Sequence, residues 1–299
     1  MPEINVGAPV GALVDWLTAH VGPLFQAISA VMLFLLDAVL AVLTAPNPFV
    51  VTLVLVALAL LERKWGFGLF TLLAFLLIQA MGLWVEAMQT LALVLVATVF
   101  AVAIGVPTGI WAARSRRASA TVRPVLDFMQ TLPVFVYLIP AVFFFGIGPV
   151  PGVIATLVFA IPPAVRLTEL GIRSVDKEVV EASVAFGAKP RQMLREVQLP
   201  LALPSIMAGV NQTLMLALSC VVIAGLVGSG GLGAVVVRGI STLDVGAGFE
   251  GGLAVVFLAI YLDRLTSALA EPRRRRPKAP KQAPSTPDQP ADQGVLASS

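Results

Sequence analysis

Eight long apolar runs constrain this chain more than any other feature of its sequence. They fall at about residues 24–45, 48–61, 66–85, 88–112, 126–147, 151–171, 203–227 and 249–269. Most approach or exceed the roughly 20 residues that a helix needs to cross a bilayer, and they lack the short alternation of a membrane β-barrel. Of the 299 residues, 58% are hydrophobic and only 12% are charged, too few for the surface of a soluble domain. We therefore predict an all-α polytopic membrane protein with seven or eight transmembrane helices.

The basic residues predict which side of the membrane each connection faces. They gather in alternate connections between the runs and in the C-terminal tail, whereas Arg238 stands almost alone on the opposite side. The set comprises Arg63, Lys64, Arg114, Arg116, Arg117, Arg123, Arg173, Lys177, Lys189, Arg191, Arg195, Arg273, Arg274, Arg275, Arg276, Lys278 and Lys281. Because cytoplasmic connections carry the excess of Lys and Arg, we predict a multi-pass protein of the inner or plasma membrane with a cytoplasmic C-terminus.

Three regions follow from this pattern. Residues 1–47 form an N-terminal segment whose apolar run, with Asp37 in its middle, either crosses the membrane first or lies on it as an interfacial helix. Residues 48–270 form the transmembrane domain. Residues 271–299 are rich in proline and polar residues, which predicts a disordered basic cytoplasmic tail. Its arginines either hold the last helix end at anionic lipid or make a regulatory contact.

Residue counts exclude several kinds of site. The single cysteine, Cys220, rules out an intrachain disulfide, and its apolar surroundings predict a buried thiol. The single histidine, His20, rules out an HExxH metal motif. Gly228, Gly230 and Gly233 fit G-x-G-x-x-G, but a dinucleotide site needs that motif between a strand and a helix, so we expect an outer turn. The chain has no P-loop sequence, and we expect no cofactor, metal or nucleic acid on it.

Prolines interrupt the later apolar runs. They are Pro107, Pro133, Pro140, Pro162, Pro163 and Pro204. Each removes a backbone donor and bends its helix, and in lipid the freed carbonyls must be satisfied by neighbours or by water. So many broken helices favour a transporter, in which irregular backbone lines the path.

Residues 173–200, which we call the charged segment, are polar and helix-forming within an otherwise apolar chain. We predict a first helix that is capped by Ser174 and ended by Gly187 in a left-handed conformation. A second helix begins at Pro190 and ends at Leu199 and Pro200, where the membrane is re-entered. One interpretation is an amphipathic loop that lies on lipid headgroups. Its small residues and its mixture of acids and bases favour a protein partner instead.

The spacing within the charged segment resembles a known signature. Glu181-Ala182-Ser183, three residues, Gly187, nine residues and Val197-Gln198-Leu199-Pro200 are similar to the EAA motif of ABC importer permeases, EAA-x3-G-x9-I-x-L-P. Ser183 stands in place of the second alanine and Val197 in place of the isoleucine. In that family the segment is a coupling helix that docks on a separate ATPase subunit. The resemblance implies this coupling role for Glu181, Ala182, Ser183, Gly187, Pro190, Arg191, Val197, Leu199 and Pro200.

The resemblance extends over about residues 84–269. "LDFMQTLPVFVYLIPAVFFFGIGPVPGV" and "GLVGSGGLG" are similar to permeases that import glycine betaine, proline and related quaternary amines. The family implies a type I importer fold, a homodimer, ATPase subunits that bind the MgATP, and an extracytoplasmic binding protein. It also implies a compatible solute as substrate, such as glycine betaine, proline or choline.

Polar and aromatic residues within the runs are candidates for the translocation path. A quaternary ammonium has no hydrogen-bond donor, so aromatic faces would hold it by cation–π attraction. The candidates are Phe128, Gln130, Phe135, Tyr137, Asn211 and Gln212. Asn211 and Gln212 either line the path or pair with a neighbouring helix. Packing and lipid contact are the ordinary roles of such aromatic residues.

Other charges near the membrane have simpler interpretations. Arg166 and Glu169 are three residues apart on one helix face and are predicted to pair. Asp263 and Arg264 lie near an inner helix end, where their side chains are expected to reach the interface.

Two other classes of function compete with the importer. A secondary, ion-coupled transporter of a small amine or amino acid would need coupling charges near the membrane midplane and would work without an ATPase. An intramembrane enzyme would need a nucleophile and a base, and the sequence offers no plausible set.

Overall fold

The computed structural model describes residues 7–60 and 65–270, and every regular element within these ranges is a helix. The elements are α1 (Gly7–Thr44), α2 (Pro48–Leu60), α3 (Trp65–Ala80), α4 (Trp84–Arg114), α5 (Arg116–Thr131), α6 (Val134–Phe145), α7 (Pro149–Arg173), α8 (Lys177–Ala185), α9 (Pro190–Gln192), the π-helix η1 (Met193–Gln198), α10 (Leu199–Ser219), α11 (Val221–Leu226), α12 (Gly231–Thr242) and α13 (Val245–Ala270). The predicted all-α class is confirmed. The tail, 271–299, and the connection that holds Arg63 and Lys64 lie outside the described residues.

The number of membrane-length helices agrees roughly with the predicted seven or eight. Within the described ranges, five helices are long and apolar enough to cross a bilayer, and the α5–α6 pair makes a sixth if it is counted as one bent span. Two shorter apolar helices, α2 and α3, pack against each other and against α13. They account for the second and third apolar runs.

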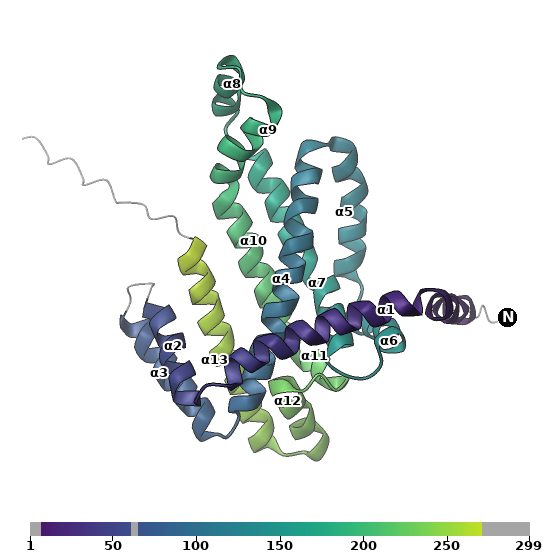
Figure 1. Cartoon of the computed structure of the whole chain (residues 1–299), viewed down its shortest axis with the longest axis vertical. Coiled ribbons are helices and arrows are strands. Elements are labelled where there is room, and N and C mark those ends of the chain that lie inside the picture. The colour runs from purple at the N-terminus through teal and green to yellow at the C-terminus, as the bar shows by residue number, and fades with distance from the viewer. Residues whose placement is uncertain (1–6, 61–64, 271–299) are drawn as a thin grey trace, which may run out of the picture.

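Helix α7 lies at the centre of the bundle, between α4 and α10 (Figure 1). Small residues let the three backbones approach closely. A Cβ atom at Gly109 of α4 would lie 2.6 Å from the Thr168 Cβ of α7, and one at Gly209 of α10 would lie 3.2 Å from the Pro163 carbonyl oxygen. In lipid such close packing, rather than water exclusion between helices, drives helix association. These glycines therefore fix the α4–α7–α10 core.

An aromatic cluster joins α13 and the α2–α3 hairpin to this core. Tyr261 of α13 is 1% exposed, meets Phe75 edge-on at 5.4 Å between ring centroids, and donates its hydroxyl to the Leu55 carbonyl of α2 at 3.2 Å. Phe75 also meets the ring of Trp84, at the start of α4, edge-on at 6.3 Å between ring centroids. A buried tyrosine needs such a hydroxyl partner, so this contact specifies where the hairpin lies.

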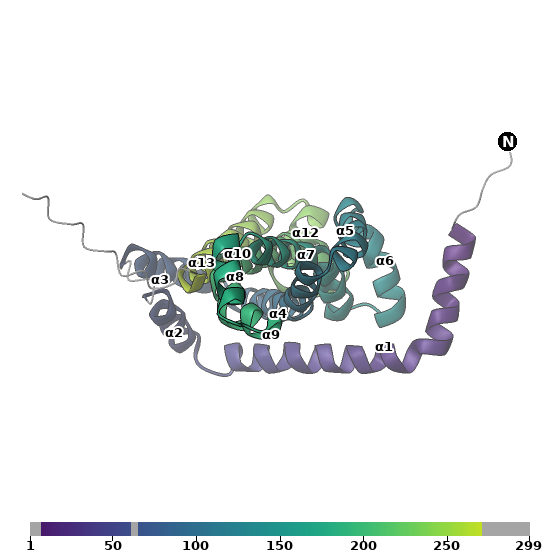
Figure 2. The same ribbon diagram turned by 90° about the horizontal axis from the view of Figure 1, so that it is seen from above.

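Helix α1 runs along one side of the bundle and across the direction of α4 and α10 (Figures 1 and 2). It buries Met32 and Leu36 against Val96 and Val153, while Asp37 is exposed. Whether residues 24–45 cross the membrane or lie on it stays a prediction.

The bundle has two distinct ends. Helices α8 and α9 project beyond it at one end, which we call the α8 end, and α12 lies at the opposite end, the α12 end (Figure 1). Arg114, Arg116 and Arg173 belong to helix ends that face the α8 end, whereas Arg238 lies on α12. The charge asymmetry predicted from the sequence thus follows the long axis of the bundle.

Candidate functional site

The charged segment forms a helical hairpin whose first helix is α8. Its cap is Asp176, whose carboxylate accepts the Glu178 N–H at 2.9 Å. The prediction that Ser174 caps this helix is wrong, because Ser174 still has the helical backbone of α7 and its hydroxyl donates to the Gly171 carbonyl at 3.1 Å. A capping residue needs non-helical backbone, and Asp176 has it, with φ −52° and ψ 128°.

Gly187 ends the first helix as predicted. Its φ is +80°, and its N–H donates to the Val184 carbonyl at 2.8 Å while the Ala188 N–H donates to the Ser183 carbonyl at 3.0 Å. These two bonds form the Schellman arrangement, which satisfies the last carbonyls of a helix and needs a left-handed residue. Any side chain with a β-carbon is strained at this position.

The second helix begins at Pro190, as predicted, but does not end at Leu199 and Pro200. It continues through η1 into α10, so that residues 190–226 form one candidate span. The wider π turn brings the Leu199 N–H to the Leu194 carbonyl, directly before Pro200, which has no N–H to donate. The charged segment is therefore joined to α7 by the short connection 174–176 and continues without a break into α10.

Every residue of α8 is at least partly exposed, and so are most signature residues. Glu181, Ala182, Gly187, Pro190, Arg191 and Pro200 are exposed, whereas Ser183, Val197 and Leu199 are partly buried. Phe186, directly before the helix-ending glycine, is 93% exposed. The Phe186 ring therefore makes almost no packing contact within the described chain. Phe186 is not among the coupling residues predicted from the sequence, although its position directly before Gly187 indicated the exposed turn.

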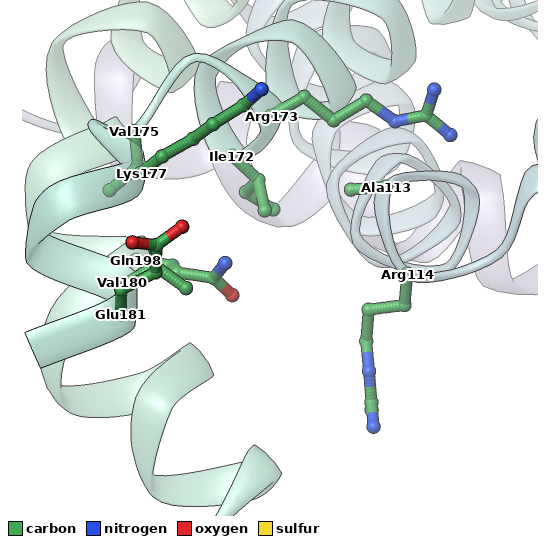
Figure 3. Close-up of a pocket in the computed structure, with 9 residues that line it drawn as sticks. All are labelled: Ala113, Arg114, Ile172, Arg173, Val175, Lys177, Val180, Glu181 and Gln198. Carbon is green, nitrogen blue, oxygen red and sulfur yellow. The ribbon is translucent and has the colours of Figure 1, made fainter. Parts of the chain in front are cut away.

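A cavity of about 270 Å³ separates the charged segment from the ends of α4 and α7. Glu181 of α8 and Gln198 of η1 extend from opposite halves of the hairpin into this region, below Ile172 and Arg173 of α7 (Figure 3). Leu194 of η1 is buried in an apolar cluster with Ile172 of α7 and with Ala202 and Ile206 of α10. The segment is thus anchored by one apolar contact and has open space beside it.

The α5–α6 pair carries four of the path candidates. The chain bends by 93° between these helices, because Leu132 precedes a proline and adopts extended backbone. The Tyr137 hydroxyl donates to the Phe128 and Met129 carbonyls and so closes the bend. Phe128 and Phe135 are 62% and 50% exposed, and Gln130 is partly buried.

The other two path candidates lie elsewhere. The Asn211 amide donates to the Asp263 carboxylate of α13 at 2.9 Å and accepts from Thr266. Two roles were predicted for Asn211, and this contact corresponds to the second, pairing with a neighbouring helix. Asp263 is partly buried beside Asn211, whereas Arg264 is exposed, and the expected position of both at the interface stays a prediction. Gln212 is exposed. Helix α13, to which Asn211 is bonded, lies on the opposite side of the bundle from the α5–α6 pair (Figure 2).

Arg166 and Glu169 do not pair with each other, because α5 offers both of them better partners. Arg166 pairs with Asp127. Glu169, whose side chain is 5% exposed, contacts Arg123 and Arg173, each at 3.2 Å. The predicted i,i+3 pair is therefore wrong: two helix-to-helix ion pairs replace it.

Residues 228–230 of the glycine-rich sequence form the expected turn, and residues 231–233 begin α12. Gly228, Gly230 and Gly231 all have positive φ. The Gly231 N–H donates to the Gln89 side chain, and the Leu232 N–H donates to the Thr90 hydroxyl, both at 2.8 Å. Side chains of α4 therefore cap α12 from a distant part of the chain. Cys220 is buried, 2% exposed, as predicted.

Comparison with known proteins identifies the family. Residues 105–276 match the family model "Binding-protein-dependent transport system inner membrane component". The glycine betaine/proline betaine transport system permease protein ProW of Escherichia coli is 51% identical over 263 residues, which are 88% of this chain and 74% of that protein. The glycine betaine transport system permease protein OpuAB of Bacillus subtilis is 43% identical over 93% of this chain and 99% of its own length.

Solved structures agree with this result. The inward-facing MetNI methionine ABC transporter matches 63% of this chain and 94% of its own chain, with 26% identity and a TM-score of 0.57. A second crystal form of the same transporter matches with the same TM-score at 24% identity. Because relatives of this kind are transport subunits whose ATPase is a separate subunit, the chain is not an enzyme. It belongs to the family of binding-protein-dependent transport system inner membrane components, and it is the permease subunit of an ABC importer.

Proposed function

We propose that the importer to which this permease belongs carries compatible solutes such as glycine betaine, proline or choline. The observation that carries the proposal is identity of about one half over nearly the whole transmembrane domain to permeases named for glycine betaine and proline betaine. A relative of Listeria monocytogenes, named for glycine betaine and carnitine, is 47% identical over 90% of this chain. Glycine betaine, proline betaine and carnitine each carry a carboxylate and a quaternary ammonium, whereas proline lacks the quaternary ammonium and choline lacks the carboxylate.

Uptake in cells tests this substrate class. Deleting the gene and following radiolabelled glycine betaine, proline and choline under osmotic stress should abolish high-affinity uptake of at least one of them. A plasmid copy of the gene should restore it. Unchanged uptake of every such solute, in a strain that has no other osmoprotectant system, would refute the proposal.

The charged segment is proposed to face the cytoplasm and to dock on the ATPase subunit, which binds the MgATP. Exposure of α8, Phe186 and the signature residues supports this role, and so does the cluster of basic residues toward the α8 end. Helix α13 runs from the α12 end toward the α8 end (Figure 1), so the tail that follows it would also be cytoplasmic. Purification of the chain should bring an ATPase with it. A secondary transporter would transport solute without one.

The assembly is proposed to be a homodimer with two ATPase subunits and an extracytoplasmic binding protein. One chain provides one set of helices and one EAA segment, whereas an ABC importer needs two membrane subunits around its path. The binding protein would then dock at the α12 end. Mass measurement of the solubilised complex should give two copies of this chain for two ATPase subunits, and a single copy would contradict the homodimer.

The path is proposed to pass the α5–α6 bend. Phe128 and Phe135 present exposed aromatic faces there, and such faces attract quaternary ammonium groups without hydrogen bonds. We expect Phe135→Ala to slow glycine betaine transport at unchanged complex yield, and Phe143→Ala, at a 68% exposed position of the same helix, to serve as the control. Asn211 and Gln212 are weaker path candidates, since Asn211 is bonded to α13.

A further inference from the structure

Glu169 is the most thoroughly buried carboxylate among the residues that the structure describes, and it joins three helices. It accepts the Ser119 hydroxyl of α5 at 2.7 Å and contacts the Arg123 guanidinium of α5 at 3.2 Å. On its own helix it contacts Arg173 at 3.2 Å, and Arg173 also donates to the Ala112 carbonyl of α4 at 2.9 Å. We call these four side chains, Ser119, Arg123, Glu169 and Arg173, the Glu169 cluster.

The charge balance of the cluster explains why a carboxylate is tolerated there. A buried carboxylate is costly unless charged and hydrogen-bonding partners surround it. Glu169 has two guanidinium groups and a hydroxyl, and its loss would leave Arg123 and Arg173 facing each other. Although the Arg123 side chain is 60% exposed, removing a partner from a buried carboxylate is costly, so the cluster ties α5 to α7 specifically.

Helix α5 depends on this link more than the core helices depend on theirs. Along α5 only Ala118, Ser119 and Leu126 are buried. Its second charged contact with α7, between Asp127 and Arg166, is 65% and 42% exposed, and exposed ion pairs contribute little. By contrast, α4 meets α7 through close backbone contacts at Gly105 and Gly109. The attachment of α5 to α7 is thus concentrated at Glu169.

The position of the cluster relates it to the charged segment. Arg173 is the last residue of α7, and α8 begins at Lys177. A displacement of α8 therefore reaches the cluster across a connection of only three residues, Ser174 to Asp176. Beyond the cluster, α5 leads into the bend that holds Phe128 and Tyr137.

We infer that Glu169 is a positioning residue for transport: it makes α5, and with it the α5–α6 bend, follow the movement that the charged segment imparts to α7. The inference rests on the proposed coupling role of the charged segment. Without the link, α7 moves and α5 lags behind. ATP is then hydrolysed without the rearrangement that moves solute.

Two substitutions separate this role from a purely structural one. Glu169→Gln removes the charge at similar size. Arg123→Gln leaves Glu169 with Arg173 and Ser119, so its carboxylate stays neutralised and the chain should fold even if Glu169→Gln does not. Arg166→Gln, which breaks the exposed pair between the same two helices, is the matched control.

The first measurement is the ratio of glycine betaine transported to ATP hydrolysed, in proteoliposomes that contain the complete complex and its binding protein. We expect Glu169→Gln and Arg123→Gln to lower this ratio about tenfold, a typical size for coupling between two sites, while stimulated ATP hydrolysis persists. Arg166→Gln should leave the ratio near wild type. An unchanged ratio in Arg123→Gln, a parallel fall of transport and hydrolysis, or an equal effect of Arg166→Gln would each overturn the inference.

A second measurement does not depend on the solute. Spin labels are placed at Ala120→Cys on α5 and, separately, at Val184→Cys on α8, both exposed positions, in a Cys220→Ser background. ATP trapping should shift the inter-subunit distance at both positions in the wild type. In Arg123→Gln, the α8 label should still shift and the α5 label should not. Movement of both labels in the variant would overturn the inference, whereas an immobile α8 label in the wild type would contradict the proposed coupling role instead.

Discussion

Helices α4, α7 and α10 are held by close contacts between their backbones, whereas the charged segment is shaped by its own caps and meets the bundle mainly through Leu194. In the core, atoms of Val165 and Thr168 lie where a β-carbon at Gly109 would be. In the charged segment, an added β-carbon at Gly187 would meet no atom of the described chain within 4 Å. A substitution in the core should therefore act on folding, and one in the charged segment should act on what the segment contacts.

The largest expected effect is that of Gly109→Leu in the core. Its β-carbon would lie 2.6 Å from both the Thr168 Cβ and the Val165 carbonyl oxygen, so α4 must separate from α7. Overpacking of this kind costs about 1–3 kcal/mol, and more where backbone must move. We expect little monodisperse protein on size-exclusion chromatography in detergent. Gly252→Leu on α13, where an added β-carbon meets no described atom within 4 Å, is the control and should give normal yield.

The sequence predicted features that depend on near neighbours better than contacts between distant parts of the chain. The turn at Gly187 and the start at Pro190 depend on neighbours a few residues away, and both were predicted correctly. The partners on α5, Asp127 for Arg166 and Arg123 for Glu169, lie 39 and 46 residues earlier in the chain, so local spacing gave the wrong pair. Only Arg173, four residues after Glu169, is a local partner. The cap of α8 was misplaced because its identity depends on where α7 stops, and both Ser174 and Asp176 are favourable caps.

Gly187→Asp should produce the next largest effect, without loss of the folded permease. At φ +80° an ordinary side chain strains the backbone by about 1–2 kcal/mol, and the new carboxylate would be buried without a partner when the ATPase docks. We expect normal membrane insertion and yield, but transport lost and ATP hydrolysis lost or no longer stimulated by substrate.

Gly187→Asn separates the two causes, because asparagine has nearly the size of aspartate and meets the same left-handed backbone but carries no charge. It should retain a substantial part of the transport activity. Wild-type coupled transport by Gly187→Asp would mean that the charged segment is only a surface loop.

Phe186→Ala should weaken the contact with the ATPase without changing the stability of the isolated permease. The side chain is 93% exposed, so its removal loses no packing within the chain. An apolar anchor at the centre of an interface typically contributes about 2 kcal/mol, or roughly thirtyfold in affinity. Titration of the detergent-solubilised permease with the ATPase subunit measures the change. Leu243→Ala, 87% exposed at the α12 end, should bind like wild type, and equal affinities for all three proteins would exclude Phe186 from the interface.

The smallest effect is expected from Asp176→Ala. This substitution tests whether the conformation of the charged segment depends on its own caps and not on the bundle core. The carboxylate satisfies the Glu178 N–H, and loss of such a cap costs about 1 kcal/mol. A helix of nine residues is marginal by itself, so α8 should fray at its start while the core is unaffected. We expect a transport rate lowered a few-fold at unchanged thermal stability of the permease, and recovery in Asp176→Ser, which keeps an oxygen at the cap. If Asp176→Ala instead lowers the melting temperature of the whole permease, the charged segment contributes to the core, and the division between the two regions is wrong.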